Sequence, residues 1–280
     1  MAFIEASLAD AYVAELLDLE SYLSFCQSTG LSLTYLAQCY NLIVKDTLCE
    51  QMYFQRHKRY RYSTFAEVAN SVYFNDNYMR KYMYGLAITS WLWPNHRGMH
   101  RFFVQHIPYK TAGVYLEIGP GHGIYMMSAM RLTSYDSFEG IDLSPTSVAL
   151  TNDLLGSGCF GNFTNYTITQ KDFLATDTLR DSYDAIVMGE VLEHVESPAS
   201  FLKKIHARSD NKTFIFITTP INAPAMDHIY LFDSVKSVED SVAQSGLRIT
   251  DCLHVPYPGL SLEAAERQCL PINVAMVLTK

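Results

Sequence analysis

The sequence predicts an α/β protein in which a mostly parallel, doubly wound sheet follows a helical segment. From residue 113 onward, short apolar runs alternate with stretches of helical length, which is typical of parallel strands joined by crossover helices. Residues 1–110 contain no convincing alternating strand. Between these parts, the apolar run that begins at Val114 leads into an acid and three glycines at alternate positions. These observations predict a helical domain before a sheet domain.

The first part is expected to contain six helices. Apolar residues recur at every third or fourth position from Ile4 to Leu23, and Thr64 with Glu67 makes a capping-box pattern. Pro94 suits the first turn of a helix. The expected helices run from Ile4 to Gly30, from Ser32 to about Lys45, from Asp46 to about Tyr62, from Thr64 onward, from Asp76 to Trp93, and from Pro94 to just before Pro108.

The second part is expected to contain seven strands. Helices fill the intervals after strands one, two, four and five, and the Ser-Pro pairs at Ser144 and Ser197 indicate two helix starts. No clear helix separates the last two strands. We therefore predict a helical lid or substrate domain over 1–110 and a sheet domain over 111–280, with the boundary near Thr111. The expected strands are 113–119, 137–143, 165–171, 183–189, 212–219, 247–255 and 273–280.

Composition narrows the class of protein. The formal net charge of -8 and the pI near 5.5 argue against broad binding of a phosphate backbone, so a nucleic acid substrate is disfavoured. The six cysteines form no C-x-x-C pair and suggest neither a zinc site nor a disulfide framework. No apolar stretch reaches about 18 residues, and the N-terminus lacks the pattern of a secretory signal. We expect a cytoplasmic protein with no membrane segment.

The glycine-rich stretch predicts a ligand site. Gly119, Gly121 and Gly123 allow a tight turn and a close approach of a ligand to the backbone. The dinucleotide fingerprint needs its third glycine three positions after the second, whereas here Gly123 comes only two positions after Gly121. Glu117, placed before the first glycine, would repel a pyrophosphate. The stretch therefore suits a cationic ligand with an amino acid head and ribose hydroxyls.

Acids also follow other strands of the predicted sheet. Asp142 comes about 20 residues after the glycines, where a carboxylate can accept hydrogen bonds from ribose hydroxyls. Asp172 and Phe173 follow the third strand, and Gly189 ends the fourth. An acid at such a place is often a helix cap, and for Asp172 alone the cap is the nearer reading. Ligands of open parallel sheets bind at the carboxyl ends of strands, so we expect these residues to gather there.

The motifs resemble those of a known family. Leu-Glu-Ile-Gly-Pro-Gly-His-Gly, Gly-Ile-Asp-Leu-Ser-Pro, Tyr-Asp-Ala-Ile-Val-Met-Gly-Glu-Val-Leu-Glu-His-Val and Phe-Ile-Thr-Thr-Pro-Ile-Asn resemble the class I S-adenosylmethionine-dependent methyltransferases, in their ubiquinone-biosynthesis-type branch. The likeness covers about 113–250. It implies a Rossmann-like sheet of six parallel strands and an antiparallel seventh, with S-adenosylmethionine as cofactor and S-adenosylhomocysteine as product.

The resemblance also implies roles for single residues. The loop of Gly119, Gly121 and Gly123, with Glu117, would carry the methionine part of the cofactor. Asp142 would accept both ribose hydroxyls and Leu143 would pack on the adenine. Asp172 would accept the adenine amino group and Phe173 would cover the base. The far wall of the cofactor site would be formed by Gly189 and Glu190.

A cluster of acids and imidazoles is expected on the methyl side of the cofactor. Glu190, Glu193 and His194 form an E-x-x-E-H pattern, and Asp227 and His228 follow the fifth strand. Small-RNA ribose methyltransferases carry E-x-x-E-H and a later histidine as magnesium ligands, and the matching positions here are Glu190, Glu193, His194 and His228. Use of His194 or His228 as a general base is favoured over a divalent metal.

Three functions compete on these residues. The leading one is methyl transfer to an oxygen, nitrogen or carbon of a small organic metabolite in a biosynthetic pathway, with the aromatic side chains of 1–110 as walls of the acceptor site. The alternatives are a metal-assisted ribose 2'-O-methyltransferase acting on RNA and a non-catalytic S-adenosylmethionine-binding protein. A homodimer is compatible with the sequence. The basic cluster from Arg56 to Arg61 is either a solvated helix end or a site for a carboxylate or phosphate.

Overall fold

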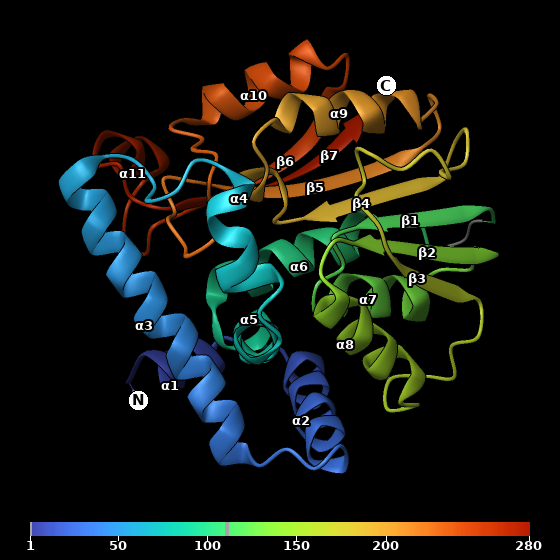
Figure 1. Cartoon of the computed structure of the whole chain (residues 1–280), viewed down its shortest axis with the longest axis horizontal. Helices are drawn as coiled ribbons and strands as arrows, with labels where there is room; N and C mark the ends of the chain where they lie inside the picture. Colours follow the sequence, from blue (N-terminus) through green and yellow to red (C-terminus); the bar gives the residue numbers. More distant parts are fainter. Residues whose placement is uncertain (1, 110–111) are drawn as a thin grey trace.

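The computed structural model describes residues 2–109 and 112–280. The expected domain boundary near Thr111 lies outside the described residues. A seven-stranded sheet, with strand order β3-β2-β1-β4-β5-β7-β6, forms the centre of the second part of the chain (Figure 1). Its strands are β1 (Val114–Ile118), β2 (Ser137–Asp142), β3 (Tyr166–Gln170), β4 (Ala185–Gly189), β5 (Phe214–Ile221), β6 (Arg248–Pro256) and β7 (Ile272–Thr279).

The sheet is mixed in the predicted way. β1 pairs in parallel with β2 and β4, and the register places Glu117 opposite Gly140 on one side and Val187 on the other. β7 runs antiparallel to both β5 and β6. All seven expected strands form, each within two residues of its expected bounds. The predicted fold, six parallel strands and an antiparallel seventh, is confirmed.

Alternate residues of the central strands are buried on opposite faces of the sheet, as the period of two requires. Leu116 and Ile118 belong to a core under α9 (Pro198–Ala207) and α10 (Val235–Gln244). Tyr115 and Phe216 belong to a core on the other face. That face is covered by α6 (Pro94–His106), α7 (Ile124–Leu132) and α8 (Pro145–Gly156) (Figure 1). The strands therefore lie between two helical layers.

The N-terminal helices differ from their expected bounds in two places. The expected first helix is two helices, because the chain is extended at Tyr12, where the backbone N–H donates to Glu15 Oε2 at 2.8 Å. The expected second and third helices are one, because Asp46 caps no helix and instead accepts a hydrogen bond from Tyr78 Oη at 2.7 Å. The helices are α1 (Ala2–Ala9), α2 (Val13–Ser28), α3 (Leu33–His57), α4 (Phe65–Val68) with a π-helical turn at Ala69–Tyr73, α5 (Asp76–Leu92) and α6.

A short helix also interrupts the final pair of strands. α11 (Leu262–Arg267) lies between β6 and β7, where no clear helix was expected. Its start is capped by Ser261, whose side chain accepts from the backbone N–H of Ala264 at 3.2 Å. No helix among the described residues is long and apolar enough to cross a membrane.

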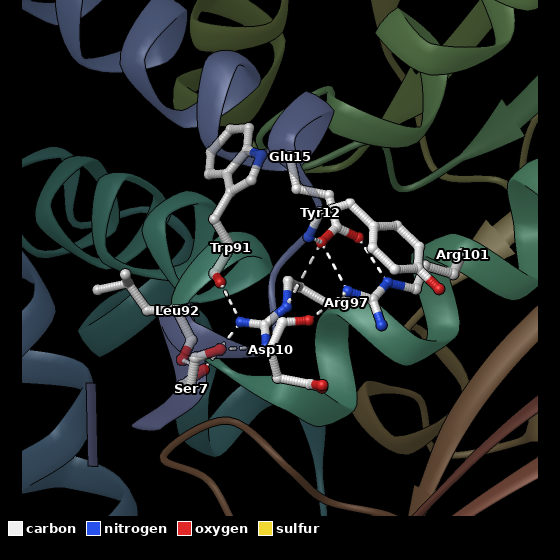
Figure 2. A network of polar contacts seen from close by, with 8 residues as sticks. All are labelled: Ser7, Asp10, Tyr12, Glu15, Trp91, Leu92, Arg97 and Arg101. Carbon is white, nitrogen blue, oxygen red and sulfur yellow. Dashed lines mark hydrogen bonds and ion pairs between the residues drawn. The ribbon is translucent and has the colours of Figure 1, made fainter. Parts of the chain in front are cut away.

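A buried arginine ties α1 to the end of α5 (Figure 2). Arg97, on α6, is 2 % exposed and donates to Ser7 Oγ at 2.8 Å, Ser7 O at 2.7 Å and Trp91 O at 2.6 Å. Arg101, one turn later, donates to both carboxylate oxygens of Glu15, at 2.6 and 2.7 Å. Because charge-assisted hydrogen bonds of this kind are strong when partly buried, α1 and α2 are fixed to the helix that covers the sheet.

Candidate active site

The glycine loop turns where β1 ends. Gly119, Gly121 and Gly123 have φ angles of 68°, 57° and 80°, in the left-handed region that side chains with a Cβ avoid. A Cβ on Gly119 would also meet Val191 Cγ2 at 2.7 Å. Gly123 immediately precedes α7, so the loop delivers the chain to a helix start. The glycines are required by the backbone itself.

Asp142 braces this loop from the end of β2. Its carboxylate accepts from the backbone N–H of Gly121 at 3.1 Å and from that of Ser144 at 2.8 Å. Leu143, beside it, is half-buried. Burial raises the pKa of Asp142 to about 6, although the backbone hydrogen bonds oppose that rise. The glycine loop after β1 and Asp142 at the end of β2 are therefore in contact, as expected.

Glu117 lies beneath the loop and is 2 % exposed. One carboxylate oxygen accepts from Tyr115 Oη at 2.6 Å, a contact between residues on the same face of β1. Burial is the largest influence on this acid and raises its pKa to about 8, and the nearby Asp142 adds to the effect. Among the described residues, neither Glu117 nor Asp142 forms an ion pair. Two acids without a cationic partner therefore lie next to the glycine loop.

The end of β3 is arranged differently. Asp172 is exposed, and its Oδ1 accepts from the backbone N–H groups of Leu174 and Ala175 at 2.8 and 3.3 Å, as a capping residue does. Phe173 is 4 % exposed and packs in the core under α9, with its ring 5.3 Å from that of Phe201. Phe173 therefore belongs to the core on that face of the sheet, and its expected contact with the adenine stays a prediction.

Gly189 and Glu190 form the end of β4. A Cβ on Gly189 would lie 2.9 Å from the ring of Tyr125. Glu190 has a φ of 53°, and its N–H donates to both oxygens of Thr218, the backbone carbonyl at 3.1 Å and the hydroxyl at 3.0 Å. Its Oε1 is buried and has no hydrogen-bond partner. Burial raises the pKa of Glu190 to about 6.

The expected acid and imidazole cluster is assembled beyond β4 and β5. The backbone carbonyl of Glu193 accepts from the N–H groups of Ile229 and Tyr230, at 2.9 and 3.0 Å, which holds the segment after β5 against the 3₁₀ turn Leu192–His194. Glu193 Oε1 lies 3.6 Å from His194 Nε2 and 4.0 Å from His228 Nε2. These three ligand atoms lie within 4.8 Å of one another. Glu190 is near but stands outside that group of three.

Hydrogen bonds fix the protons of both imidazoles. His228 Nδ1 lies 2.6 Å from Ala223 O, and His194 Nδ1 lies 3.2 Å from Asp227 O. A carbonyl oxygen only accepts, so both Nδ1 atoms carry protons, and in the neutral imidazoles each Nε2 is the acceptor nitrogen, on the side of Glu193. Burial, with the neighbouring His194, lowers the pKa of His228 to about 3.

Glu193 completes the cluster as a buried acid. Its side chain is 0 % exposed, and Oε2 accepts from Thr219 Oγ1 at 3.0 Å while Oε1 has no hydrogen-bond partner. Burial and the neighbouring Glu190 raise the pKa of Glu193 well above its usual value. Three acceptor atoms therefore converge without a donor among them, an arrangement that calls for a proton or a cation.

Tyrosines of the N-terminal helices reach this cluster. Tyr73 and Tyr82 donate to the two carboxylate oxygens of Asp227 at 3.1 and 3.0 Å, and Asp227 Oδ2 lies 3.3 Å from His194 Nδ1. Tyr60 packs edge-on against His228 with ring centroids 5.6 Å apart. Sequence reasoning missed Tyr60 because it lies within the basic cluster, where the charges dominate the pattern. The one sign in the sequence that this residue turns inward was an aromatic side chain within a run of basic ones.

The glycine loop is likewise covered by N-terminal helices. Met83 Sδ, on α5, lies 3.6 Å from the place where a Cβ of Gly121 would stand. A cavity of about 10 Å³ between the loop and these helices is lined from α2, α5, the loop and α8. Its lining residues are Tyr22, Phe25, Met83, Tyr84, His122, Leu150 and Leu154.

The sequence from 87 to 255 matches a family model described as methyltransferase domain. That match spans more than half of the 280-residue chain, so the chain belongs to this family. With its seven-stranded sheet, it is a class I S-adenosylmethionine-dependent methyltransferase. No curated protein sequence matches the chain.

Solved structures agree on the fold. The [4+2]-cyclase SpnF is 13% identical with a TM-score of 0.54, over 68% of this chain and 82% of that one. The cyclopropane synthase MmaA2 from Mycobacterium tuberculosis is 11% identical with a TM-score of 0.52, over 68% of this chain and 85% of that one. At such identities the likeness identifies the fold and leaves the acceptor open.

Proposed function

We propose that this chain transfers a methyl group from S-adenosylmethionine to an oxygen, nitrogen or carbon of a small organic metabolite, as a biosynthetic enzyme of the ubiquinone-biosynthesis-type branch. The observation that supports it most is the acid and imidazole cluster, which lies under aromatic side chains at the carboxyl ends of β4 and β5. A cytoplasmic location and a homodimer stay predictions from the sequence.

The residues around the glycine loop fit the cofactor. Glu117 and Asp142 are acids without ion pairs, and a ligand with an amino group and ribose hydroxyls would supply the missing partners. Leu143, Asp172 and Gly189 would line the rest of the site by the family resemblance. When bound, S-adenosylmethionine supplies its methyl group as an electrophile at the sulfonium.

Cofactor binding is expected to strengthen as the pH rises from 6 to about 8. Free Glu117, with its pKa raised to about 8, is protonated over most of this range, whereas an ammonium group favours the ionised acid. Binding therefore releases a proton, and the association constant rises by up to about tenfold per pH unit before it levels off above the pKa. Calorimetry with S-adenosylhomocysteine at three pH values measures this slope. Glu117→Gln should flatten it, and a flat wild-type profile would contradict the assignment.

We further propose that residues 1–110 act as a lid over the acceptor site. The backbone N–H of Phe65 donates to Glu196 Oε1 at 2.8 Å, and Thr146 Oγ1 donates to Asp76 Oδ1 at 2.9 Å. With the two tyrosine contacts to Asp227, these bonds join α4 and α5 to the sheet domain. Exclusion of water by such a lid holds the acceptor and the methyl group in alignment.

His194 is the stronger candidate for the general base. Its Nδ1 proton is held by Asp227, which leaves Nε2 free to take a proton from an acceptor hydroxyl while the oxygen attacks the methyl carbon. Its side chain is 18% exposed, so an acceptor can reach it. His228 is a weaker base, because its pKa is lowered to about 3. Glu190 would stabilise the imidazolium that forms.

A second candidate mechanism uses a divalent cation. The convergence of Glu193 Oε1 with the two Nε2 atoms favours it, because neutral imidazoles oriented through Nδ1 by backbone carbonyls are the usual state of metal-bound histidines. Such an ion would bind acceptor oxygens, as in the ribose 2'-O-methyltransferases that act on RNA. The net charge of -8 opposes an RNA acceptor.

A labelling experiment tests the function. The protein is incubated with S-adenosylmethionine labelled in its methyl group, together with either the small-molecule fraction or the RNA fraction of a cell extract. We expect label to enter the small-molecule fraction and not the RNA, because the aromatic walls suit an organic acceptor. Heat-denatured protein gives the background. Label found in RNA alone would contradict the proposal and favour the metal-assisted alternative.

A further inference from the structure

A groove lies on the outer side of the last turns of α3, in the basic cluster that the proposed function does not use. Its volume is about 290 Å³. The lining residues lie on successive turns of α3 and on the loop that follows it, and they combine basic groups with apolar ones. They are Cys49, Met52, Tyr53, Arg56, His57 and Arg61.

Two of the basic groups of the groove, Arg61 and His57, are held in place by neighbouring side chains. Arg61 Nε donates to both carboxylate oxygens of Glu50, at 3.0 and 3.1 Å, and Glu50 is 3 % exposed. The guanidinium carbon of Arg61 lies 4.2 Å from the centre of the Tyr53 ring, and the His57 ring lies 4.3 Å from the same centre. Among the described residues, the terminal nitrogens of Arg61 make no hydrogen bond. They are oriented and available to a ligand.

The groove carries more positive charge than its neighbours neutralise. In the described part of the chain Arg56 has no acidic partner, and Glu50 engages Arg61 only through Nε. Arg56 and Arg61 together carry more charge than one carboxylate balances. A phosphate dianion with three acceptor oxygens matches this set better, because arginine forks pair with phosphate oxygens.

We propose that this groove binds a small organic phosphate monoester, with the phosphate on Arg56, His57 and Arg61 and its apolar part against Met52 and Tyr53. The site is independent of the methyl-transfer cluster. Tyr60, between His57 and Arg61 in sequence, is buried and turns inward to His228, whereas Arg56 and His57 are exposed.

A soluble phosphate is favoured over a lipid headgroup. The net charge of -8 opposes adsorption to an anionic membrane, which requires basic charge over a broad surface. The groove is also bounded by side chains of one helix and one loop, so it accommodates a single compact group.

Phenyl phosphate is the probe, and calorimetry without S-adenosylmethionine is the measurement. Arg56→Gln is expected to weaken binding by about tenfold or more, because it removes a charge-assisted hydrogen bond. Arg59→Gln is the matched control, since Arg59 is exposed in the same segment but does not line the groove, and its effect should stay below about twofold. Neither arginine makes an ion pair in the described chain, so both variants should fold.

Several results would overturn the proposal. These are the absence of phenyl phosphate binding, equal weakening by both variants, or benzoate binding as tight as phenyl phosphate. Vesicles of phosphatidylcholine with phosphatidic acid test whether the groove binds a lipid headgroup instead. Their capture of the protein, lost in Arg56→Gln but kept in Arg59→Gln, would overturn the assignment to a soluble ligand. These binding experiments contain no S-adenosylmethionine and do not measure methyl transfer. A negative result would therefore not bear on the proposed methyl transfer.

Discussion

Replacement of His194 by alanine is expected to lower the rate of methyl transfer by about 10² to 10⁴-fold, the usual contribution of a general base. His194 Nε2 is the one imidazole nitrogen of the pair that combines partial exposure with a carboxylate on the opposite nitrogen. Affinity for S-adenosylhomocysteine should stay within about twofold, since the glycine loop and Asp142 are untouched. Single-turnover kinetics measure the first quantity and calorimetry the second.

His228→Ala distinguishes the general-base mechanism from the mechanism that uses a divalent cation. If His194 is the base, the loss in His228→Ala should stay below about tenfold, because His228 only packs beside it with ring centroids 4.7 Å apart. If a cation binds Glu193, His194 and His228, both variants should be inactive, chelation should abolish wild-type turnover, and Mg²⁺ should restore it. His254→Ala, on β6, is the control. Full activity of both His194→Ala and His228→Ala would reject both mechanisms.

Asp142→Ala is expected to weaken binding of S-adenosylmethionine and S-adenosylhomocysteine by about 100-fold or more. Two losses combine: the ribose hydroxyls lose their acceptor, and the backbone N–H of Gly121 loses the carboxylate that holds the loop. Each hydrogen bond to a charged group contributes about 1.5–3 kcal/mol, and about 1.4 kcal/mol is a tenfold change. Calorimetry on the wild type and the variant measures the difference.

The matched control for this experiment is Asp210→Ala. Asp210 also accepts from two backbone N–H groups of a turn, those of Lys212 and Thr213 at 2.7 and 3.1 Å, but it lies away from the glycine loop and the strand ends that form the site. It should leave cofactor affinity within about twofold. Equal affinity in Asp142→Ala and wild type, with unchanged melting temperature, would show that the ribose is held elsewhere.

The sequence by itself determined the sheet and the glycine loop. Strand positions follow from short continuous apolar runs such as Val114 to Ile118, which are typical of central strands buried on both faces of a parallel sheet. The positive φ angles of Gly119, Gly121 and Gly123 were likewise predictable, because only the residue type and its local spacing are needed. These features depend on residues that are close together in the chain, so they can be predicted from a single sequence.

Only the tertiary structure decided contacts between distant parts of the chain. Asp46 was read as a helix start, but Tyr78 takes its carboxylate, and α3 continues. The packing of Phe173 against Phe201 under α9 was also not predictable from the sequence, and its expected contact with the adenine stays a prediction. The assignment of the base to His194 rests on Asp227, 33 positions away, and the tyrosines that contact Asp227 come from the N-terminal helical segment. Which side chains form a hydrogen bond across the fold depends on how the helical layers pack on the sheet. The order of residues alone does not specify which distant residues come into contact.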